Sequence, residues 1–278
     1  MPSVYTSQQK TKIQQLCSVT QVPERTAAKF LKSNDWKVEQ AANAFFQASG
    51  GSGGSSASGQ TAALNKLFDS YRDDPEENPD IIGVEGAMRY LKDIKVQLDE
   101  IAVLAIGEAL QAPTMGEFTR DGFVKGWRTL NSDTLTKQQS AASRLRTQLP
   151  TDQDLFRRVY RYTFQLARLP GQKAVALDAA IEYWRLLFTP PHGVAWSTPS
   201  GTPWLDRWIT YLTERWKRTV NRDMWNMTYE FFRKSIEQDD LSWWDEQGAW
   251  PGVLDDFVGY VKETREKEGG EPGAMEVE

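Results

Sequence analysis

The stretch DQDLFRRVYRYTFQL, residues 152–166, shows the pattern that decides the fold. Its large apolar side chains recur at intervals of three and four residues, which is the period of one face of an α-helix. No stretch alternates apolar and polar residues as a half-buried strand does, and prolines lie between most helical segments. We therefore predict an all-α fold. The same helical period fits residues 61–71, 84–94, 101–110, 120–130, 134–149, 177–187, 203–217, 221–237 and 253–267.

A shorter helical module precedes these segments, over residues 7–48. Ser7 is a suitable cap for a first helix that runs through Leu16. A second helix is expected at residues 24–31, because Pro23 is well placed at a helix start. After a turn at residues 34–36, a third helix is expected from 38 to 46, which completes a compact three-helix bundle.

The sequence GGSGGSSASG, residues 50–59, separates this module from the rest of the chain. Gly and Ser carry no apolar surface and keep the conformational entropy of the chain high, so we expect a flexible linker at residues 49–60. The larger helical domain then covers residues 61–265. The acidic, glycine-rich remainder, residues 266–278, is expected to be a disordered tail.

The composition excludes several classes of protein. Cys17 and His192 are the only cysteine and the only histidine, so the chain offers neither a disulfide framework nor the four ligands of a structural zinc site. A net charge of −5, with basic and acidic residues mixed along the chain, argues against a nucleic-acid partner. No apolar run is long enough for a membrane span, and the polar N-terminus lacks a signal-peptide core. We expect a monomer in the cytoplasm and nucleus that uses no cofactor.

No complete set of catalytic residues is evident. Cys17 is the only candidate for a thioester nucleophile, and its apolar neighbours Leu16 and Val19 favour a buried structural thiol instead. Asp223 and Asp255 are candidates for acid–base chemistry, but no base, nucleophile or metal-binding set lies near them in sequence. We interpret both as parts of a solvent-facing or partner-facing acidic patch.

Residues 67–85 have the outline of a calcium-binding loop between two helices. Asp69, Asp73 and Glu85 supply oxygen atoms, but Asp74 stands where a working loop needs glycine, and two prolines interrupt the ligand series. We predict an EF-hand-like helix pair without metal, followed by a second such pair around residues 117–127. A calcium-responsive regulator is the alternative.

Several motifs together resemble two known kinds of domain. TAAKFL at residues 26–31 and NDWKVEQAANAFF at 34–46 look like a ubiquitin-associated (UBA) domain. The larger domain is similar to the PONY domain of the defective-in-cullin-neddylation family, and the resemblance covers nearly the whole chain in family order. Its motifs are PGQK at 170–173, AIEYW at 180–184, DMWN at 223–226 and DEQGAWPGVLDDFV at 245–258.

The resemblance implies a non-catalytic, scaffold-type ligase co-factor for cullin neddylation. Such a protein binds a cullin C-terminal domain, here through Asp223, Ala249 and Asp255. It also binds the neddylation-conjugating enzyme, whose N-acetylated methionine enters an apolar pocket. Acetylation suits such a pocket because burying a charged amine is strongly unfavourable. The pocket maps onto Leu91, Val103, Leu104, Ile106, Gly107, Leu110, Phe118, Leu166, Tyr183 and Leu186.

For the N-terminal module, the resemblance implies weak binding of ubiquitin through the loop Val19-Thr20-Gln21 and the last helix near Phe45. The usual Met-Gly-Phe loop is missing. A tethered module of modest importance is the alternative for this part of the chain. For the whole protein, a ubiquitin receptor or calcium-responsive regulator is the alternative to the neddylation co-factor.

Overall fold

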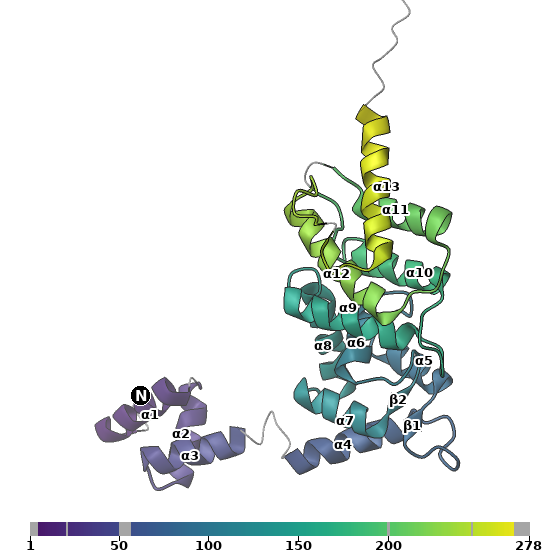
Figure 1. Ribbon diagram of the computed structural model, residues 1–278. Helices are drawn as coiled ribbons and strands as arrows, with labels where there is room; N and C mark the ends of the chain where they lie inside the picture. The colour runs from purple at the N-terminus through teal and green to yellow at the C-terminus, as the bar shows by residue number, and fades with distance from the viewer. Residues whose placement is uncertain (1–4, 21, 50–56, 199–200, 246, 270–278) are drawn as a thin grey trace, which may run out of the picture. The chain divides into compact units, whose positions relative to one another are not determined.

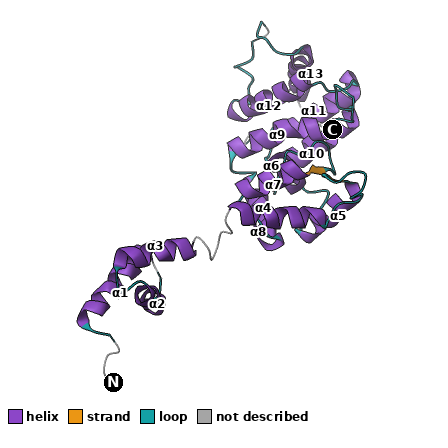
Figure 2. Ribbon diagram, turned by 90° about the horizontal axis from the view of Figure 1, so that it is seen from below, coloured by secondary structure: helices purple, strands orange, loops and turns teal. Residues whose placement is uncertain are grey.

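The computed structural model describes residues 5–20, 22–49, 57–198, 201–245 and 247–269. Its described part consists of helices and a single pair of short strands, drawn in purple and orange in Figure 2. The predicted all-α fold is therefore confirmed. The chain separates into two compact units, Met1–Ala63 and Leu64–Glu278. None of the described helices is both long and apolar enough to cross a membrane.

The N-terminal unit is a three-helix bundle of α1 (Ser7–Thr20), α2 (Glu24–Ser33) and α3 (Val38–Ser49). Each helix contributes to a small apolar core, as the length of the module predicts. Partly buried side chains, Trp36 among them, pack around this core. The fully buried members are Ile13, Leu16, Ala27, Ala28, Leu31 and Ala41.

Thr6, and not Ser7, caps the first helix. The hydroxyl of Thr6 accepts a hydrogen bond from the backbone N–H of Gln9 (3.3 Å). In return, the side-chain oxygen of Gln9 accepts one from the backbone N–H of Thr6 (3.0 Å). This reciprocal pair is a capping box, which satisfies two backbone donors at a helix start. The prediction of a cap at Ser7 was therefore wrong by one residue, because the glutamine that completes the box lies three residues after Thr6.

Every helix predicted for the larger unit is present. Nearly all of their ends lie within a few residues of the predicted ends, where prolines and capping residues interrupt the helical period. Figure 1 labels them along the chain. They are α4 (Ala57–Asp69), α5 (Val84–Asp93), α6 (Ile101–Ala109), α7 (Arg120–Thr129), α8 (Leu135–Gln148), α9 (Gln153–Ala167), α10 (Leu177–Phe188), α11 (Trp204–Tyr211), α12 (Arg222–Glu237) and α13 (Gly252–Gly269).

The predicted helix at residues 203–217 is not a single α-helix. Its last turn, Leu212–Trp216, is a π-helical turn, η1. This turn closes with a hydrogen bond from the backbone N–H of Lys217 to the carbonyl of Leu212, five residues back (2.9 Å). Lys217 then adopts a left-handed conformation (φ 54°), which ends the helix.

The helices extend into both segments that we expected to be irregular. α4 begins at Ala57, inside the predicted linker, while residues 50–56 lie outside the described part. α13 continues to Gly269, so residues 266–269 of the predicted disordered tail are helical. A tertiary contact accounts for this extension, because Arg207 of α11 forms an ion pair with Glu268 (2.7 Å). Residues 270–278 lie outside the described part.

Two helix–loop–helix units, α4–α5 and α6–α7, are joined by short strands in their loops. β1 (Ile81–Ile82) pairs antiparallel with β2 (Phe118–Thr119). The guanidinium of Arg120 lies against the first loop, with hydrogen bonds to Asp69 (2.7 Å) and Asp80 (2.6 Å). Among the residues that the structure describes, no group of three or more His, Cys, Asp or Glu side chains is arranged to hold a metal ion.

α9 lies at the centre of the larger unit, packed between α6 and α12 (Figure 1). Its aromatic side chains join a continuous cluster with those of α10 and α12. Within this cluster, the buried ring of Trp225 stacks on Trp184 (centroids 5.0 Å apart) and on Tyr160 (4.9 Å). These contacts fix the start of α12, which carries Asp223, relative to α9.

Candidate partner-binding sites

Asp223 is exposed in the first turn of α12. The helix start is well defined, because the side-chain oxygen of Asn221 accepts a hydrogen bond from the backbone N–H of Met224 (2.8 Å). Trp225, two residues after Asp223, is buried. A carboxylate in a first turn also interacts favourably with the positive end of the helix dipole. The local sequence therefore presents the Asp223 carboxylate to solvent at little cost in stability.

Asp255 lies in the first turn of α13 at the edge of a hollow of about 480 Å³. The hollow carries charges of both signs, since Arg215 pairs with Glu263 (3.0 Å) and lies over the ring of Tyr260 (4.8 Å). Burial and the nearby Asp256 carboxylate raise the pKa of Tyr211 to about 12. The remaining lining residues are Trp216, Arg218 and Gly259.

Ala249 is exposed in the connector between α12 and α13. Large indole rings hold this connector against the domain. Trp244 and Trp250 stack on each other (4.8 Å, 28°), and Trp243 packs edge-on against Phe231 of α12 (5.4 Å). The small Ala249 side chain thus belongs to an anchored segment, where it leaves room for a partner to approach.

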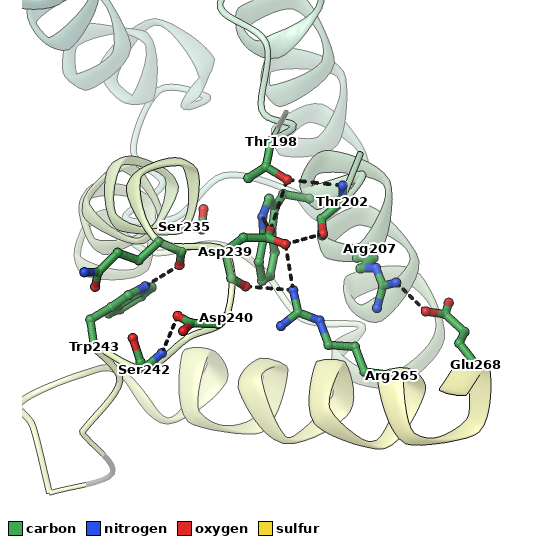
Figure 3. Close-up of polar contacts among 12 residues, drawn as sticks. Thr198, Thr202, Arg207, Ser235, Asp239, Asp240, Ser242, Trp243, Arg265 and Glu268 are labelled. Carbon is green, nitrogen blue, oxygen red and sulfur yellow. Dashed lines mark hydrogen bonds and ion pairs between the residues drawn. The ribbon is translucent and has the colours of Figure 1, made fainter. Parts of the chain in front are cut away.

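A polar cluster around Asp239 ties the same connector to two other segments (Figure 3). The Asp239 carboxylate accepts hydrogen bonds from the hydroxyl of Thr202 (2.7 Å) and from Nε1 of Trp204 (2.8 Å). Arg265 of α13 donates to the backbone carbonyl of Asp239 (2.8 Å). The proline-rich segment before α11, whose role the sequence did not reveal, therefore helps to hold the connector that carries Ala249.

Most residues mapped to the acetyl-methionine pocket lie in the core of the larger unit. Leu91, Val103, Leu104, Ile106, Gly107, Leu110, Phe118 and Leu166 are buried, whereas Tyr183 and Leu186 are partly exposed. Burial raises the pKa of Tyr183, so its phenol stays protonated at neutral pH. Eight of the ten are therefore enclosed in the core, and Tyr183 and Leu186 are the ones that reach the surface.

Gly107 of α6 faces the side chain of Leu166 on α9. A Cβ atom at this position would lie 2.8 Å from Cδ1 of Leu166, which is closer than carbon atoms pack. The absence of a side chain at Gly107 therefore makes room for Leu166.

Exposed apolar side chains flank the predicted pocket on the elements that carry Leu91 and Phe118. Val84 and Met88 of α5 are 56% and 44% exposed, and Met115, in the loop before β2, is 37% exposed. Our mapping did not include them. The spacing of four residues between Val84 and Met88, which places both on one helix face, is the signal that could have identified them.

The predicted ubiquitin-binding loop is partly helical. Val19 and Thr20 belong to the last turn of α1, where the Thr20 hydroxyl donates to the carbonyl of Leu16. Gln21 and the side chains of Val19 and Phe45 lie outside the described residues. The expectation of a loop at Val19 and Thr20 was therefore wrong.

Cys17 is a partly buried free thiol on α1. Burial and the nearby Glu24 carboxylate raise the pKa of the thiol. A raised pKa lowers the fraction of reactive thiolate at neutral pH. The surroundings of Cys17 are thus those of a structural residue and not those of an activated nucleophile.

These features define a class of protein: an all-helical chain with a small three-helix module and a larger domain that carries aspartates in the first turns of α12 and α13. The family described as cullin binding matches residues 137–260, which include Asp223, Ala249 and Asp255. The UBA-like domain family matches residues 10–52.

Similar proteins cover almost the entire chain. It is 37% identical to Defective in cullin neddylation protein 1 of Pyricularia oryzae, over 98% of this chain and 99% of that protein. The protein of the same name from Yarrowia lipolytica is 32% identical, over 90% of this chain and 96% of its own length. DCN1-like protein 3 of Drosophila melanogaster is 33% identical, over 72% of this chain and 55% of that protein. The chain belongs to the defective-in-cullin-neddylation family, as its motifs predicted.

Proposed function

We propose that this protein is a non-catalytic co-factor of cullin neddylation, which holds a cullin C-terminal domain and the N-terminally acetylated conjugating enzyme at the same time. One observation carries the proposal: the cullin-binding match contains all three residues of the expected cullin site, and Asp223 and Ala249 among them are exposed. The names of the similar proteins connect the family with cullin neddylation.

The mechanism that we propose is positional. The conjugating enzyme supplies the thioester-linked modifier, and the cullin supplies the acceptor lysine. A protein that binds both restricts their relative orientation, and holding two reactants in a near-attack geometry accelerates transfer without a catalytic side chain. The raised pKa of Cys17, the only thiol, agrees with such a role.

On the cullin side, Asp223 and Asp255 attract lysine and arginine side chains of the partner. Charge complementarity increases the rate of encounter and fixes the register of a complex. When one member of a desolvated interface pair is removed, the affinity typically falls by about 2–5 kcal/mol. Charge reversal at either aspartate should therefore abolish cullin binding.

On the side of the conjugating enzyme, the core around Gly107 and Leu166 accepts the acetylated methionine. Burying a methionine side chain contributes about 1.5–3 kcal/mol. An unacetylated amine would bring an unpaired charge into the same apolar surroundings, which is strongly unfavourable. Binding should therefore depend on acetylation.

The test is the rate of cullin modification in a reconstituted system, with wild type, Asp255→Lys and Asp154→Lys. Asp154 is the control because, like Asp255, it is an aspartate in the first turn of a helix, and it lies outside the predicted cullin site. We expect wild type and Asp154→Lys to accelerate the reaction, and Asp255→Lys to lose the effect while its circular dichroism spectrum is unchanged. If wild type brings no acceleration, the proposal is wrong.

The match of residues 10–52 to the UBA-like family supports a second, separate proposal, that the N-terminal unit binds ubiquitin weakly. Titration of ubiquitin into the isotope-labelled chain tests it. We expect chemical-shift changes confined to α1 and α3. Shifts elsewhere, or none at millimolar ubiquitin, would exclude this role.

A further inference from the structure

Helices α6, α9 and α12 enclose a polar hollow on the surface of the larger unit, with a volume of about 510 Å³. We call it the basic hollow, because its charged side chains are mostly arginines. Its lining residues are Glu108 of α6, Arg158, Arg161, Tyr162 and Gln165 of α9, and Arg222 and Asn226 of α12.

The arginines of the basic hollow are only partly neutralised. Arg158 lies 3.3 Å from Glu108, and Arg161 lies 3.5 Å from Glu230, which Arg157 also approaches at 3.5 Å. Charge-assisted hydrogen bonds between nitrogen and oxygen are usually about 2.7–2.9 Å long, so these ion pairs are loose. Each of them uses one of the five donors of a guanidinium. The side chains of Arg158 and Arg161 are 58% and 47% exposed, so most of their donors face solvent.

The third arginine of the basic hollow is Arg222, at the start of α12. Its guanidinium lies over the ring of Phe164, 5.6 Å from the ring centroid. A guanidinium that stacks on an aromatic ring keeps its edge donors available for a carboxylate. The basic hollow thus presents three forked donors on an acidic chain whose net charge is −5.

The position of the basic hollow is as informative as its charge. Glu108 directly follows Gly107, and Gln165 directly precedes Leu166, so one wall adjoins the predicted acetyl-methionine pocket. On α12, Arg222 directly precedes Asp223 of the predicted cullin site. The hollow is therefore lined by helices that also carry residues of both proposed binding sites.

We propose that the basic hollow binds an acidic segment of the conjugating enzyme, as a contact additional to its acetylated N-terminus; this inference rests on the proposed function. Charge identifies the partner. Asp223 and Asp255 select a cullin surface that is basic, and a cluster of arginines would repel such a surface. The conjugating enzyme, held by its N-terminus beside Glu108 and Gln165, is the partner that is free to bring carboxylates to the arginines.

Attachment at two points affects both the affinity and the orientation of the conjugating enzyme. A flexible N-terminus alone leaves the body of the enzyme free to rotate, whereas a second contact becomes effectively intramolecular once the first is made. It raises the overall affinity and narrows the range of orientations in which the thioester can approach the cullin lysine.

The test compares the full-length conjugating enzyme with its acetylated N-terminal peptide, by calorimetry at low and physiological salt. For the double variant Arg158→Gln/Arg161→Gln, we expect the affinity for the full-length enzyme to fall about 5- to 20-fold and its salt dependence to weaken. The affinity for the peptide should be unchanged. Arg128→Gln/Arg144→Gln, which removes the same charge from exposed positions outside the hollow, should match wild type in both measurements.

Arg222→Gln is a second test that disturbs neither of the ion pairs of Arg158 and Arg161, and we expect it to weaken full-length binding in the same direction. Unchanged affinity and salt dependence for the full-length enzyme, with peptide binding intact, would overturn the inference and leave the proposed function standing. Weakened cullin binding in place of enzyme binding would overturn it as well. If wild type binds neither peptide nor enzyme, the proposed function fails and the inference with it.

Discussion

Tyr160 and Trp225 each donate a side-chain hydrogen bond to the backbone carbonyl of the other. The hydroxyl of Tyr160 lies 2.8 Å from the carbonyl oxygen of Trp225, and Nε1 of Trp225 lies 2.9 Å from the carbonyl oxygen of Tyr160. Nε1 of Trp184 donates to the same hydroxyl (2.9 Å). This reciprocal pair fixes α9 against α12, and with them the arginines of the basic hollow and Asp223.

Removal of the Tyr160 hydroxyl should destabilise the larger unit. All three aromatic side chains are fully buried, so Tyr160→Phe leaves the buried indole N–H of Trp184 without its acceptor. The Trp225 carbonyl also loses a bond but keeps its place within α12. An unsatisfied buried donor costs about 1–3 kcal/mol, so we expect the free energy of unfolding to fall by about 2–3 kcal/mol in urea denaturation.

Tyr162→Phe is the matched control for this measurement. Its hydroxyl donates a single hydrogen bond to the carbonyl of Ala112 (2.9 Å) at a partly exposed position. Loss of one such bond costs about 0.5–1.5 kcal/mol. Equal losses in the free energy of unfolding for the two variants would show that the reciprocal pair stabilises the unit no more than a single hydrogen bond does.

The guanidinium of Arg120 binds the loop that has the outline of a calcium-binding site. Burial alone would lower the pKa of Arg120, but hydrogen bonds to Asp80 and Asp69 outweigh it and raise the pKa. The same side chain donates to the carbonyl of Pro79 (2.7 Å) and lies over the ring of Phe68. We expect Arg120→Ala to lower the free energy of unfolding by about 1–2 kcal/mol, a modest loss because both carboxylates are considerably exposed. Arg120→Lys should recover less than half, because an ammonium lacks the forked donors.

The same arrangement predicts no response to calcium. Of the candidate ligands, Asp69 already accepts a hydrogen bond from Arg120 and Asp73 pairs with Arg89, and the series lacks its glycine and several donors. Thermal unfolding should therefore give the same midpoint with millimolar calcium and with chelator. A rise in the midpoint at micromolar calcium would revive the calcium-responsive alternative.

The helices could be predicted from the sequence because their signals are local. Capping residues such as Thr134 and Asp152, whose side chains accept hydrogen bonds from the first helical turn, lie at the ends of periodic segments. The end of α13 was missed because a contact distant in sequence lies at the end of this helix. The ion pair of Arg207 with Glu268, which extends α13, joins residues 61 positions apart.

The sequence could predict only those binding-site residues that lie within recognisable motifs. DMWN and DEQGAWPGVLDDFV located Asp223 and Asp255, but nothing local indicates that Arg158 and Arg222 face one hollow. That proximity arises only when α9 packs against α12. The cluster around Asp239 could not be predicted for the same reason. Thr202 and Trp204 bind its carboxylate although they lie more than thirty residues away in sequence.

The glycines of α6 and α7 should respond differently to the same substitution. A Cβ at Gly107 would meet the mobile end of Leu166, whereas a Cβ at Gly126 would lie 2.4 Å from the backbone carbonyl of Ala109. A side-chain end can rotate away, but a carbonyl in a helix cannot. We expect Gly107→Ala to change the free energy of unfolding by less than about 1 kcal/mol and to weaken binding of the acetylated peptide. Gly126→Ala should cost about 2 kcal/mol or more, as overpacking does. Comparable unfolding curves for the two variants would contradict this account.

Glu100 makes the stability of the larger unit depend on pH. Burial tends to raise the pKa of this carboxyl, but hydrogen bonds from Arg146 and from the backbone N–H of Gln97 outweigh it and hold the pKa below its ordinary value of 4.5. The pair is bidentate, with nitrogen–oxygen distances of 2.8 and 2.6 Å, and largely shielded from solvent. Because the folded state favours the ionised form, the stabilisation is fully present above pH 4.5 and is lost as the pH falls through the lowered value.

Glu100→Gln should therefore lower the free energy of unfolding by about 1–3 kcal/mol at neutral pH, and the difference from wild type should shrink as the pH falls below about 4.5. Urea denaturation at a series of pH values measures both effects. Glu182→Gln is the control, because Glu182 pairs with Arg185 at a position where its side chain is 71% exposed, and it should change stability by less than about 0.5 kcal/mol at every pH. A difference between wild type and Glu100→Gln that stays constant down to pH 3 would mean that packing, and not the charge pair, makes Glu100 stabilising.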